Sequence, residues 1–293
     1  MRPRAWVTAL IAIAGSFGPQ TGSRAGDSPS AYAIPSTEVR RLHSMTNDVD
    51  YELYISLPRG YDPESAERHP VIYLLDAAYS FPIAHAVVWH LGDRQHLPPV
   101  ILVAIAYSGP LQYRLHRTRD YTPTFHLTGG YGNEFQHVSG GGPRFLEFIE
   151  DELIPYVEET YRVNGNRTLV GHSYGGLFAV WSGLTEPALF DRILAVSPSL
   201  WYDDYLVLRL EERNRKADAR LPSRIYLTVG DREVNELRDM VADLRAFARR
   251  LEDRSGRQMQ LRWEVLEGET HNSVFPGGFS RGLRWLFEDQ GAR

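Results

Sequence analysis

A serine lies between two glycines in Gly171-His172-Ser173-Tyr174-Gly175, directly after the apolar run Thr168-Leu169-Val170. Apolar residues at helical spacing follow this motif (Leu177, Phe178, Val180, Trp181 and Leu184). A strand, a Gly-x-Ser-x-Gly turn and a helix in this order predict a turn so tight that the residues flanking the serine can have almost no side chain. Such a turn holds the hydroxyl out at the edge of a sheet. The motif therefore predicts an α/β fold with Ser173 as candidate nucleophile.

A second segment, Gly278-Phe279-Ser280-Arg281-Gly282, matches the same pattern. It follows Phe275-Pro276-Gly277, which we expect to be a loop and not a strand, and no histidine lies after it. The context therefore favours Ser173 over Ser280.

Strand-like and helix-like segments alternate along the rest of the chain. The apolar runs at 69–76 and 100–107 are typical of central strands that are buried on both faces. Further strands are expected at 51–57, 193–196, 224–229 and 260–266, and helices at 81–91, 145–161, 234–251 and 279–287, with a kink at Pro155. This order predicts a mostly parallel, doubly wound α/β sheet.

The segment 108–142 has no clear period and carries aromatic and histidine side chains among glycines. Loops this long in compact domains are usually lids or binding loops. We therefore expect a lid-like insertion here, with a disordered surface excursion as the alternative, which the aromatic content disfavours.

The N-terminal residues are typical of a secretory signal peptide. Arg2 and Arg4 precede a short apolar stretch, and Ser23-Arg24-Ala25 offers small residues at a cleavage site. We expect a signal peptide over 1–25, export to the periplasm or the medium, and a single α/β-hydrolase domain over 26–293. The alternative is a disordered tail, and the apolar stretch is too short to span a bilayer comfortably.

The net charge of −5 argues against general affinity for nucleic acids or membrane surfaces. Because the chain has no cysteine, disulfides and thiolate metal sites are excluded. The histidines have no carboxylate at ligand spacing, so we expect neither a metal nor a cofactor, and a small-molecule ester as the partner. The oligomeric state does not follow from the sequence.

A serine hydroxyl needs a base, and the base needs an orienting carboxylate. In the α/β-hydrolase order, serine is followed by the acid and then by the histidine. Of the ten histidines only His271 lies after Ser173, in a loop that follows the last predicted strand. Asp231 and Glu233 both lie in the turn after 224–229, and Glu233, three positions after Gly230, is the favoured acid.

Backbone N–H groups must stabilise the oxyanion that forms during attack. The N–H of Tyr174, at the start of the helix after Ser173, is the first candidate. The second is expected after the strand that ends at Leu75-Asp76, from Ala77 or Ala78. We expect His172 to be structural and packed beneath the turn.

Several segments together carry a family resemblance: 71–76 (VIYLLD), 169–178 (LVGHSYGGLF), 197–201 (SPSLW), 230–233 and 268–271. With them the chain resembles the esterase-D-like branch of the α/β hydrolases, and within it most of all the siderophore trilactone esterases. The resemblance covers nearly all of the mature chain. It implies Ser173 as nucleophile, His271 as base, Glu233 as acid and oxyanion donors near Ala78 and Tyr174. Where the family often has Asp-Gly, this chain has Asp76-Ala77.

For the substrate, we expect Arg117, Arg119 and Trp201 to contribute. Arginines beside aromatic faces suit an anionic aromatic ligand such as a ferric catecholate siderophore. In the alternative, the arginines form ion pairs with Asp120 and its neighbours, and Trp201 packs in the core.

The expected function is that of a serine carboxylic-ester hydrolase with an acyl-enzyme on Ser173, acting on siderophore esters. Hydrolysis of a short-chain acyl ester or thioester, and acyl transfer to an alcohol, use the same residues and stay open. A non-catalytic binding protein would be expected to lack a member of the triad, and all members are present.

Overall fold

The computed structural model describes residues 31–109, 112–254 and 259–288, and the signal peptide predicted at 1–25 lies outside them. Contacts divide the chain into two units, Met1–Pro35 and Ser36–Arg293. All elements below belong to the second unit. None of the helices in the described residues is both long enough and apolar enough to cross a membrane.

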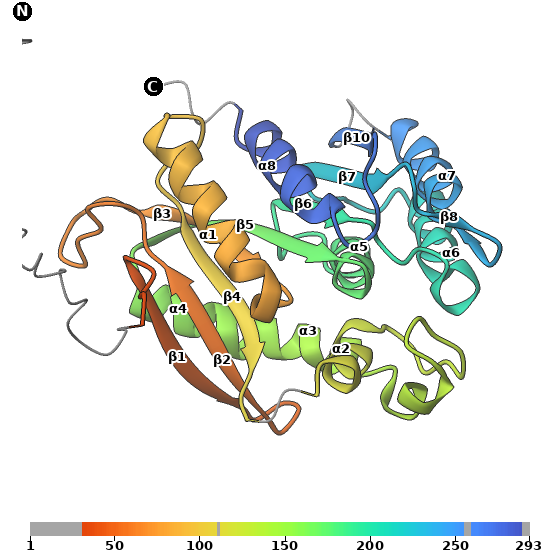
Figure 1. Cartoon of the computed structure of the whole chain (residues 1–293), viewed down its shortest axis with the longest axis horizontal. Coiled ribbons are helices and arrows are strands. Elements are labelled where there is room, and N and C mark those ends of the chain that lie inside the picture. The colour runs from red at the N-terminus through yellow and green to blue at the C-terminus, as the bar shows by residue number, and fades with distance from the viewer. Residues whose placement is uncertain (1–30, 110–111, 255–258, 289–293) are drawn as a thin grey trace, which may run out of the picture. The chain divides into compact units, whose positions relative to one another are not determined.

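An eight-stranded sheet forms the centre of this unit (Figure 1), in the order β1-β2-β4-β3-β5-β6-β7-β10. Its strands are β1 (Thr37–Ser44), β2 (Val49–Ser56), β3 (His69–Leu74), β4 (Ile101–Tyr107), β5 (Val163–His172), β6 (Arg192–Val196), β7 (Arg224–Gly230) and β10 (Gln260–Leu266). The β1–β2 and β2–β4 pairs are antiparallel, and all other pairs are parallel. The predicted α/β class with a mostly parallel sheet is confirmed.

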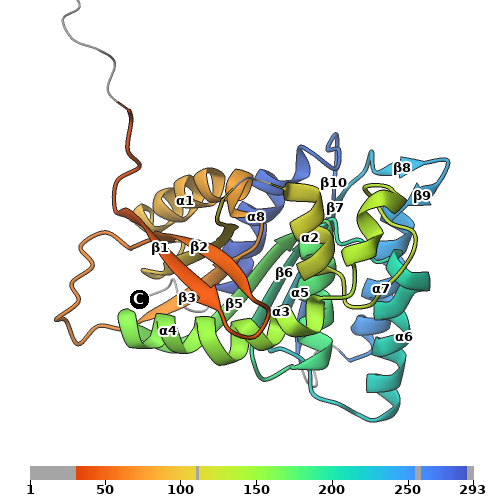
Figure 2. The same ribbon diagram turned by 90° about the horizontal axis from the view of Figure 1, so that it is seen from below.

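Helices cover both faces of the sheet, which is why β3 and β6 are buried at every position. Figure 2 shows α1 (Ala77–Asp93) and α8 (Val274–Leu286) on one face, and α3 (Gly142–Phe148), α4 (Ile154–Thr160), α5 (Tyr174–Thr185) and α6 (Tyr202–Lys216) on the other. The helix α7 (Met240–Glu252) packs against β7 and β10.

The expected kink at Pro155 is present as a π-helical segment, Ile149–Leu153, between α3 and α4. Proline has no N–H to donate, and its ring clashes with the carbonyl one turn earlier. The wider π turn accommodates this break, so the three segments continue one another.

The helix expected over 234–251 begins only at Met240. A short hairpin, β8 (Val234–Asn235) and β9 (Arg238–Asp239), precedes it. The Asn235 side chain accepts hydrogen bonds from the backbone N–H groups of Leu237 and Arg238, each over 3.0 Å. These bonds stabilise a turn at Asn235 instead of a helix. The helix α7 then begins after Asp239, whose side chain caps it by accepting from the N–H of Ala242.

The residues 275–277 are helical, which corrects the expected loop, because α8 begins at Val274. The second Gly-x-Ser-x-Gly match therefore lies inside a helix. An added Cβ at Gly278 would lie 2.6 Å from Thr228, so this glycine serves the packing of α8 on the sheet. Because Ser280 lies within α8 and not in a strand-to-helix turn, the structure excludes it as the nucleophile more strongly than the sequence does.

The insertion expected at 108–142 contains α2 (Tyr113–Tyr121) and a 3-10 helix, η1 (Asn133–Val138). The N–H of Gly130 donates to the hydroxyl of Tyr174 on α5 over 2.7 Å. The insertion is therefore bonded to the first residue of the helix that follows Ser173.

Candidate active site

Ser173 is the one residue between β5 and α5, and its backbone has φ 59° and ψ −118°. A positive φ is strained for a residue with a side chain, so the surroundings must hold it. The Ser173 N–H donates to the carbonyl of Val196 over 3.0 Å, and its carbonyl accepts from the N–H of Leu177 over 2.9 Å. Ser173 is half-buried between the buried residues His172 and Tyr174, and it lines a cavity.

The first glycine of the motif is required by close approach of the backbone. A Cβ added at Gly171 would lie 2.1 Å from the carbonyl oxygen of Gly175. No side chain fits there. The strand–turn–helix unit predicted from the motif is confirmed.

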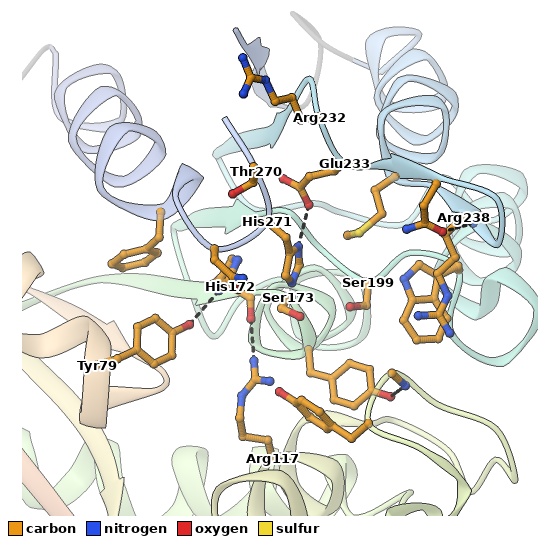
Figure 3. Close-up of a pocket in the computed structure, with 18 of the residues that line it drawn as sticks. Tyr79, Arg117, His172, Ser173, Ser199, Arg232, Glu233, Arg238, Thr270 and His271 are labelled. Atoms are coloured by element: carbon orange, nitrogen blue, oxygen red, sulfur yellow. Dashed lines mark hydrogen bonds and ion pairs between the residues drawn. The ribbon is translucent and has the colours of Figure 1, made fainter. Parts of the chain in front are cut away.

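His271 lies in the loop after β10, and its Nδ1 is 2.6 Å from Oε2 of Glu233. The other carboxylate oxygen of Glu233 accepts from the Ser197 hydroxyl over 2.5 Å and from the Gly230 N–H over 2.7 Å. Glu233 is only 6% exposed, so these partners hold it in one orientation. Figure 3 shows the His271 ring extending from Glu233 toward Ser173, and all three residues line the same cavity.

Asp231, the alternative acid, lies elsewhere. It is exposed, and its Oδ1 accepts from the N–H of Gly268 over 2.9 Å. Asp231 thus supports the turn before His271 without reaching the imidazole.

This arrangement can activate a hydroxyl group. A carboxylate at Nδ1 keeps the proton on that nitrogen, so Nε2 is free to accept a proton from a serine. The carboxylate also stabilises the imidazolium that results. The geometry therefore suits nucleophilic attack on a carbonyl carbon.

His172 packs against the same imidazole, with the two ring centroids 4.7 Å apart. Its Nδ1 lies 2.8 Å from the hydroxyl of Tyr79. Burial, with the nearby charges of His271 and Arg117, lowers the pKa of His172 well below its usual value. A neutral His172 adds no positive charge beside the His271 imidazole. This agrees with the structural role that we expect for His172.

Arg117 and Arg119 do not project as free cations into the cavity. Arg117 lines it but is buried, and its Nε and Nη2 pair with Asp76 over 2.5 and 3.0 Å. Arg119 is not among the lining residues and pairs with Asp120 over 2.6 and 3.0 Å. Both guanidiniums are therefore held in ion pairs, as in the alternative stated for the sequence, and their contact with a substrate stays a prediction.

Trp201 does line the cavity, as expected. The guanidinium of Arg238 lies over its ring, 3.5 Å from the centroid. Arg238 and Arg232, which also lines the cavity, were not recognised in the sequence. The signal that could have identified them is their closeness in sequence to the predicted acid, since both lie within five residues of Glu233.

The cavity has a volume of about 660 Å³, within the range of small-molecule sites. Ala78 is not among its lining residues. Together with Ala77 it lines a separate cavity beside Asp76 and Tyr113. Ala77 and Ala78 lie in the first turn of α1, where backbone N–H groups have no acceptor within the helix, and the second oxyanion donor stays a prediction.

Within the described residues, His126, Asp203 and Asp204 form a group whose spacing could hold a metal ion. None of the three lines the cavity at Ser173. They are therefore separate from the serine, histidine and glutamate arrangement.

The sequence model of an esterase family, described as "Putative esterase", matches residues 44–286. The chain belongs to this family. The chain is 32% identical to the ferri-bacillibactin esterase BesA of Bacillus subtilis (strain 168), over 91% of this chain and 94% of that protein. It is 30% identical to the siderophore triacetylfusarinine C esterase of Aspergillus fumigatus, over 90% of this chain and 97% of that protein.

Among solved structures, an IroE-like serine hydrolase from Shewanella oneidensis is 34% identical and superposes with a TM-score of 0.77. The match covers 86% of this chain and 80% of that one. The α/β-hydrolase fold expected from the resemblance is confirmed, and the chain is an esterase-type hydrolase.

Proposed function

We propose that this protein is a serine carboxylic-ester hydrolase that opens the ester bonds of siderophore trilactones through an acyl-enzyme on Ser173. The observation that carries the proposal is the bond between His271 and the buried, fully bonded carboxylate of Glu233, in the cavity that Ser173 lines. Relatives named as siderophore esterases, similar over nearly their whole length, support the substrate class.

In the first half of the reaction, the Ser173 oxygen bonds to the lactone carbonyl carbon while Nε2 of His271 takes the hydroxyl proton. The carbon–oxygen ester bond then breaks, and His271 returns the proton to the departing alkoxide. The products are an alcohol and an ester between the acyl group and Ser173.

In the second half, a water molecule attacks the acyl-enzyme and gives its proton to His271. The bond to Ser173 breaks, His271 reprotonates the serine oxygen, and a carboxylic acid leaves. Each lactone bond therefore consumes one water molecule. Glu233 stays ionised throughout and stabilises the imidazolium.

The backbone N–H of Tyr174 serves as an oxyanion donor in this proposal. Tyr174 is the first residue of α5, and the first N–H groups of a helix have no acceptor within it. The positive end of the helix dipole also favours negative charge there. One such donor contributes about 3 kcal/mol to transition-state stabilisation.

Ser173→Ala tests the mechanism, and Ser280→Ala is the matched control in the second motif. We expect Ser173→Ala to lower kcat on 4-nitrophenyl butyrate by about 10⁶-fold. Ser280→Ala should keep wild-type turnover because Ser280 lies within α8. Full activity in Ser173→Ala would refute the mechanism.

The substrate class is tested by following hydrolysis of a catecholate trilactone, with and without ferric iron, by chromatography of the linear products. We expect turnover of the trilactone to exceed that of the butyrate ester in kcat/KM. If the enzyme cleaved the butyrate ester but no trilactone, the siderophore assignment would be wrong while the serine mechanism stood.

A further inference from the structure

Arg238 and Trp201 form a cationic aromatic surface on the cavity wall, which we call the Arg238–Trp201 shelf. The guanidinium carbon lies 3.5 Å from the centre of the indole. The Trp201 ring is tilted against Tyr174, with centroids 6.1 Å apart. Tyr174 directly follows Ser173, so the shelf adjoins the reacting serine through one aromatic ring.

Among the described residues, Arg238 has no carboxylate within ion-pair distance, and the acidic charge that interacts with it is that of Asp243 on α7, beyond that distance. In the part of the chain that the structure describes, no acidic group lies within ion-pair distance of Arg238 or of Arg232 at the cavity rim. Of the other charged groups that line the cavity, Arg117 is paired with Asp76, and the Glu233 carboxylate bonds the imidazole that serves as the base. Because Arg232 and Arg238 outnumber the one carboxylate of Glu233, the net charge offered to a ligand is positive.

The two forms of a catecholate trilactone differ in charge. A phenolic hydroxyl keeps its proton near neutral pH because its pKa is about 10, so the iron-free form is uncharged there. Binding of ferric iron displaces all six phenolic protons and leaves an anion with three net negative charges. A cation that is not paired elsewhere attracts only the ferric form, and the indole face accepts the aromatic rings of both.

We propose that the Arg238–Trp201 shelf makes this enzyme select the ferric form of its siderophore over the iron-free form. This inference rests on the proposed function. Arg238 is placed for the task by the β8–β9 hairpin, whose turn Asn235 holds by accepting from the N–H of Arg238. The hairpin directly follows the acid Glu233 and carries Arg238, the residue that interacts with the charge of the substrate.

The test compares kcat/KM for the ferric and the iron-free trilactone in three variants. Arg238→Gln removes the charge at similar length, Arg238→Lys keeps the charge without the planar stack, and Arg284→Gln removes an exposed arginine of α8 that lines a different cavity. We expect wild type to favour the ferric form and Arg238→Gln to lower the ratio about fivefold. Arg238→Lys should retain most of the preference, and Arg284→Gln all of it.

Salt provides an independent readout. Added NaCl should lower kcat/KM for the ferric form in the wild type and have a smaller effect in Arg238→Gln, because screening acts only on the charge interaction. If Arg238→Gln lowered kcat/KM equally for both substrates, their ratio would be unchanged. The shelf would then be merely structural, and the inference would be overturned.

Binding to Ser173→Ala separates this inference from the proposed function. Calorimetric titration with the ferric and the iron-free trilactone needs no turnover. We expect tighter binding of the ferric form, with the difference lost when Arg238→Gln is added. Equal affinity for both forms would refute the shelf even where hydrolysis of trilactones is observed, and failed hydrolysis with ferric-selective binding would refute only the proposed function.

Discussion

Arg117 donates a hydrogen bond from Nη2 to the carbonyl oxygen of His172 over 3.0 Å. The same guanidinium pairs with Asp76, the residue directly before α1, and both side chains are at least 98% buried. Since His172 directly precedes Ser173, the insertion is joined through α2 to the strained turn. We therefore expect Arg117 to help position Ser173.

Arg117→Gln should lower the free energy of unfolding by about 3 kcal/mol, because it leaves the Asp76 carboxylate buried without its partner. Urea unfolding followed by circular dichroism measures this. The double variant Arg117→Met with Asp76→Leu should be more stable than Arg117→Gln, since it removes both buried charges. The matched control is Arg41→Gln, whose exposed pair with Glu52 should contribute little. Equal stability of Arg117→Gln and wild type would contradict a stabilising role for the buried Arg117–Asp76 pair.

Glu233→Gln should lower kcat on 4-nitrophenyl butyrate by about 10⁴-fold, because an amide no longer holds His271 in the required tautomer. Asp231→Asn should keep turnover near that of the wild type, since the Asp231 carboxylate bonds only the Gly268 N–H among the contacts described. Steady-state kinetics of the two variants decides between the acids. A larger loss in Asp231→Asn would reverse the assignment.

Gly171→Ala should prevent the turn from closing, because the new methyl group would meet the Gly175 carbonyl oxygen at 2.1 Å. We expect a loss of stability of about 3 kcal/mol, typical of severe overpacking, together with loss of esterase activity. Gly92→Ala is the control. Nothing lies within 4 Å of a Cβ at Gly92 in α1, so alanine should leave stability equal or raise it. A thermally stable, active Gly171→Ala enzyme would argue against the tight turn.

The buried His172 should make stability depend on pH. Burial lowers its folded pKa well below the value of about 6.5 in an unfolded chain. As the pH falls below about 6.5, the unfolded chain takes up the proton first, so stability present above that pH is lost, by up to about 1.4 kcal/mol per pH unit.

Replacing the imidazole in His172→Gln should remove this contribution. Urea unfolding at several pH values between 7.5 and 5 should therefore show a smaller stability loss in the variant than in the wild type. His85 and His116, whose pKa values burial also lowers, are present in both proteins and cancel in the difference. Parallel pH profiles for the two proteins would contradict a buried neutral His172.

The sequence was informative where structure depends on near neighbours. The alternation of apolar runs predicted the parallel strands, because strands covered on both faces must be continuously apolar. The Gly-x-Ser-x-Gly turn predicted Ser173 as the nucleophile, because a side chain at Gly171 would clash with Gly175 only four residues later in the chain. Chain order then selected His271. The hairpin at Val234–Asp239 was missed because a single Asn235 side chain outweighs the helical pattern around it.

Side-chain partners that come from distant segments were decided only by the tertiary structure. Glu233 and Asp231 lie two residues apart, yet packing of β6 and β7 puts Ser197 and the Gly230 N–H around Glu233 alone. Arg117 is held in a buried ion pair because Asp76, 41 positions earlier in the chain, lies between β3 and α1 and next to the guanidinium. The contact between Arg238 and Trp201 likewise joins two distant segments of the chain. Charge and aromatic character are written in the sequence, but which charge is neutralised and which remains free for a ligand depends on distances that only the folded chain creates.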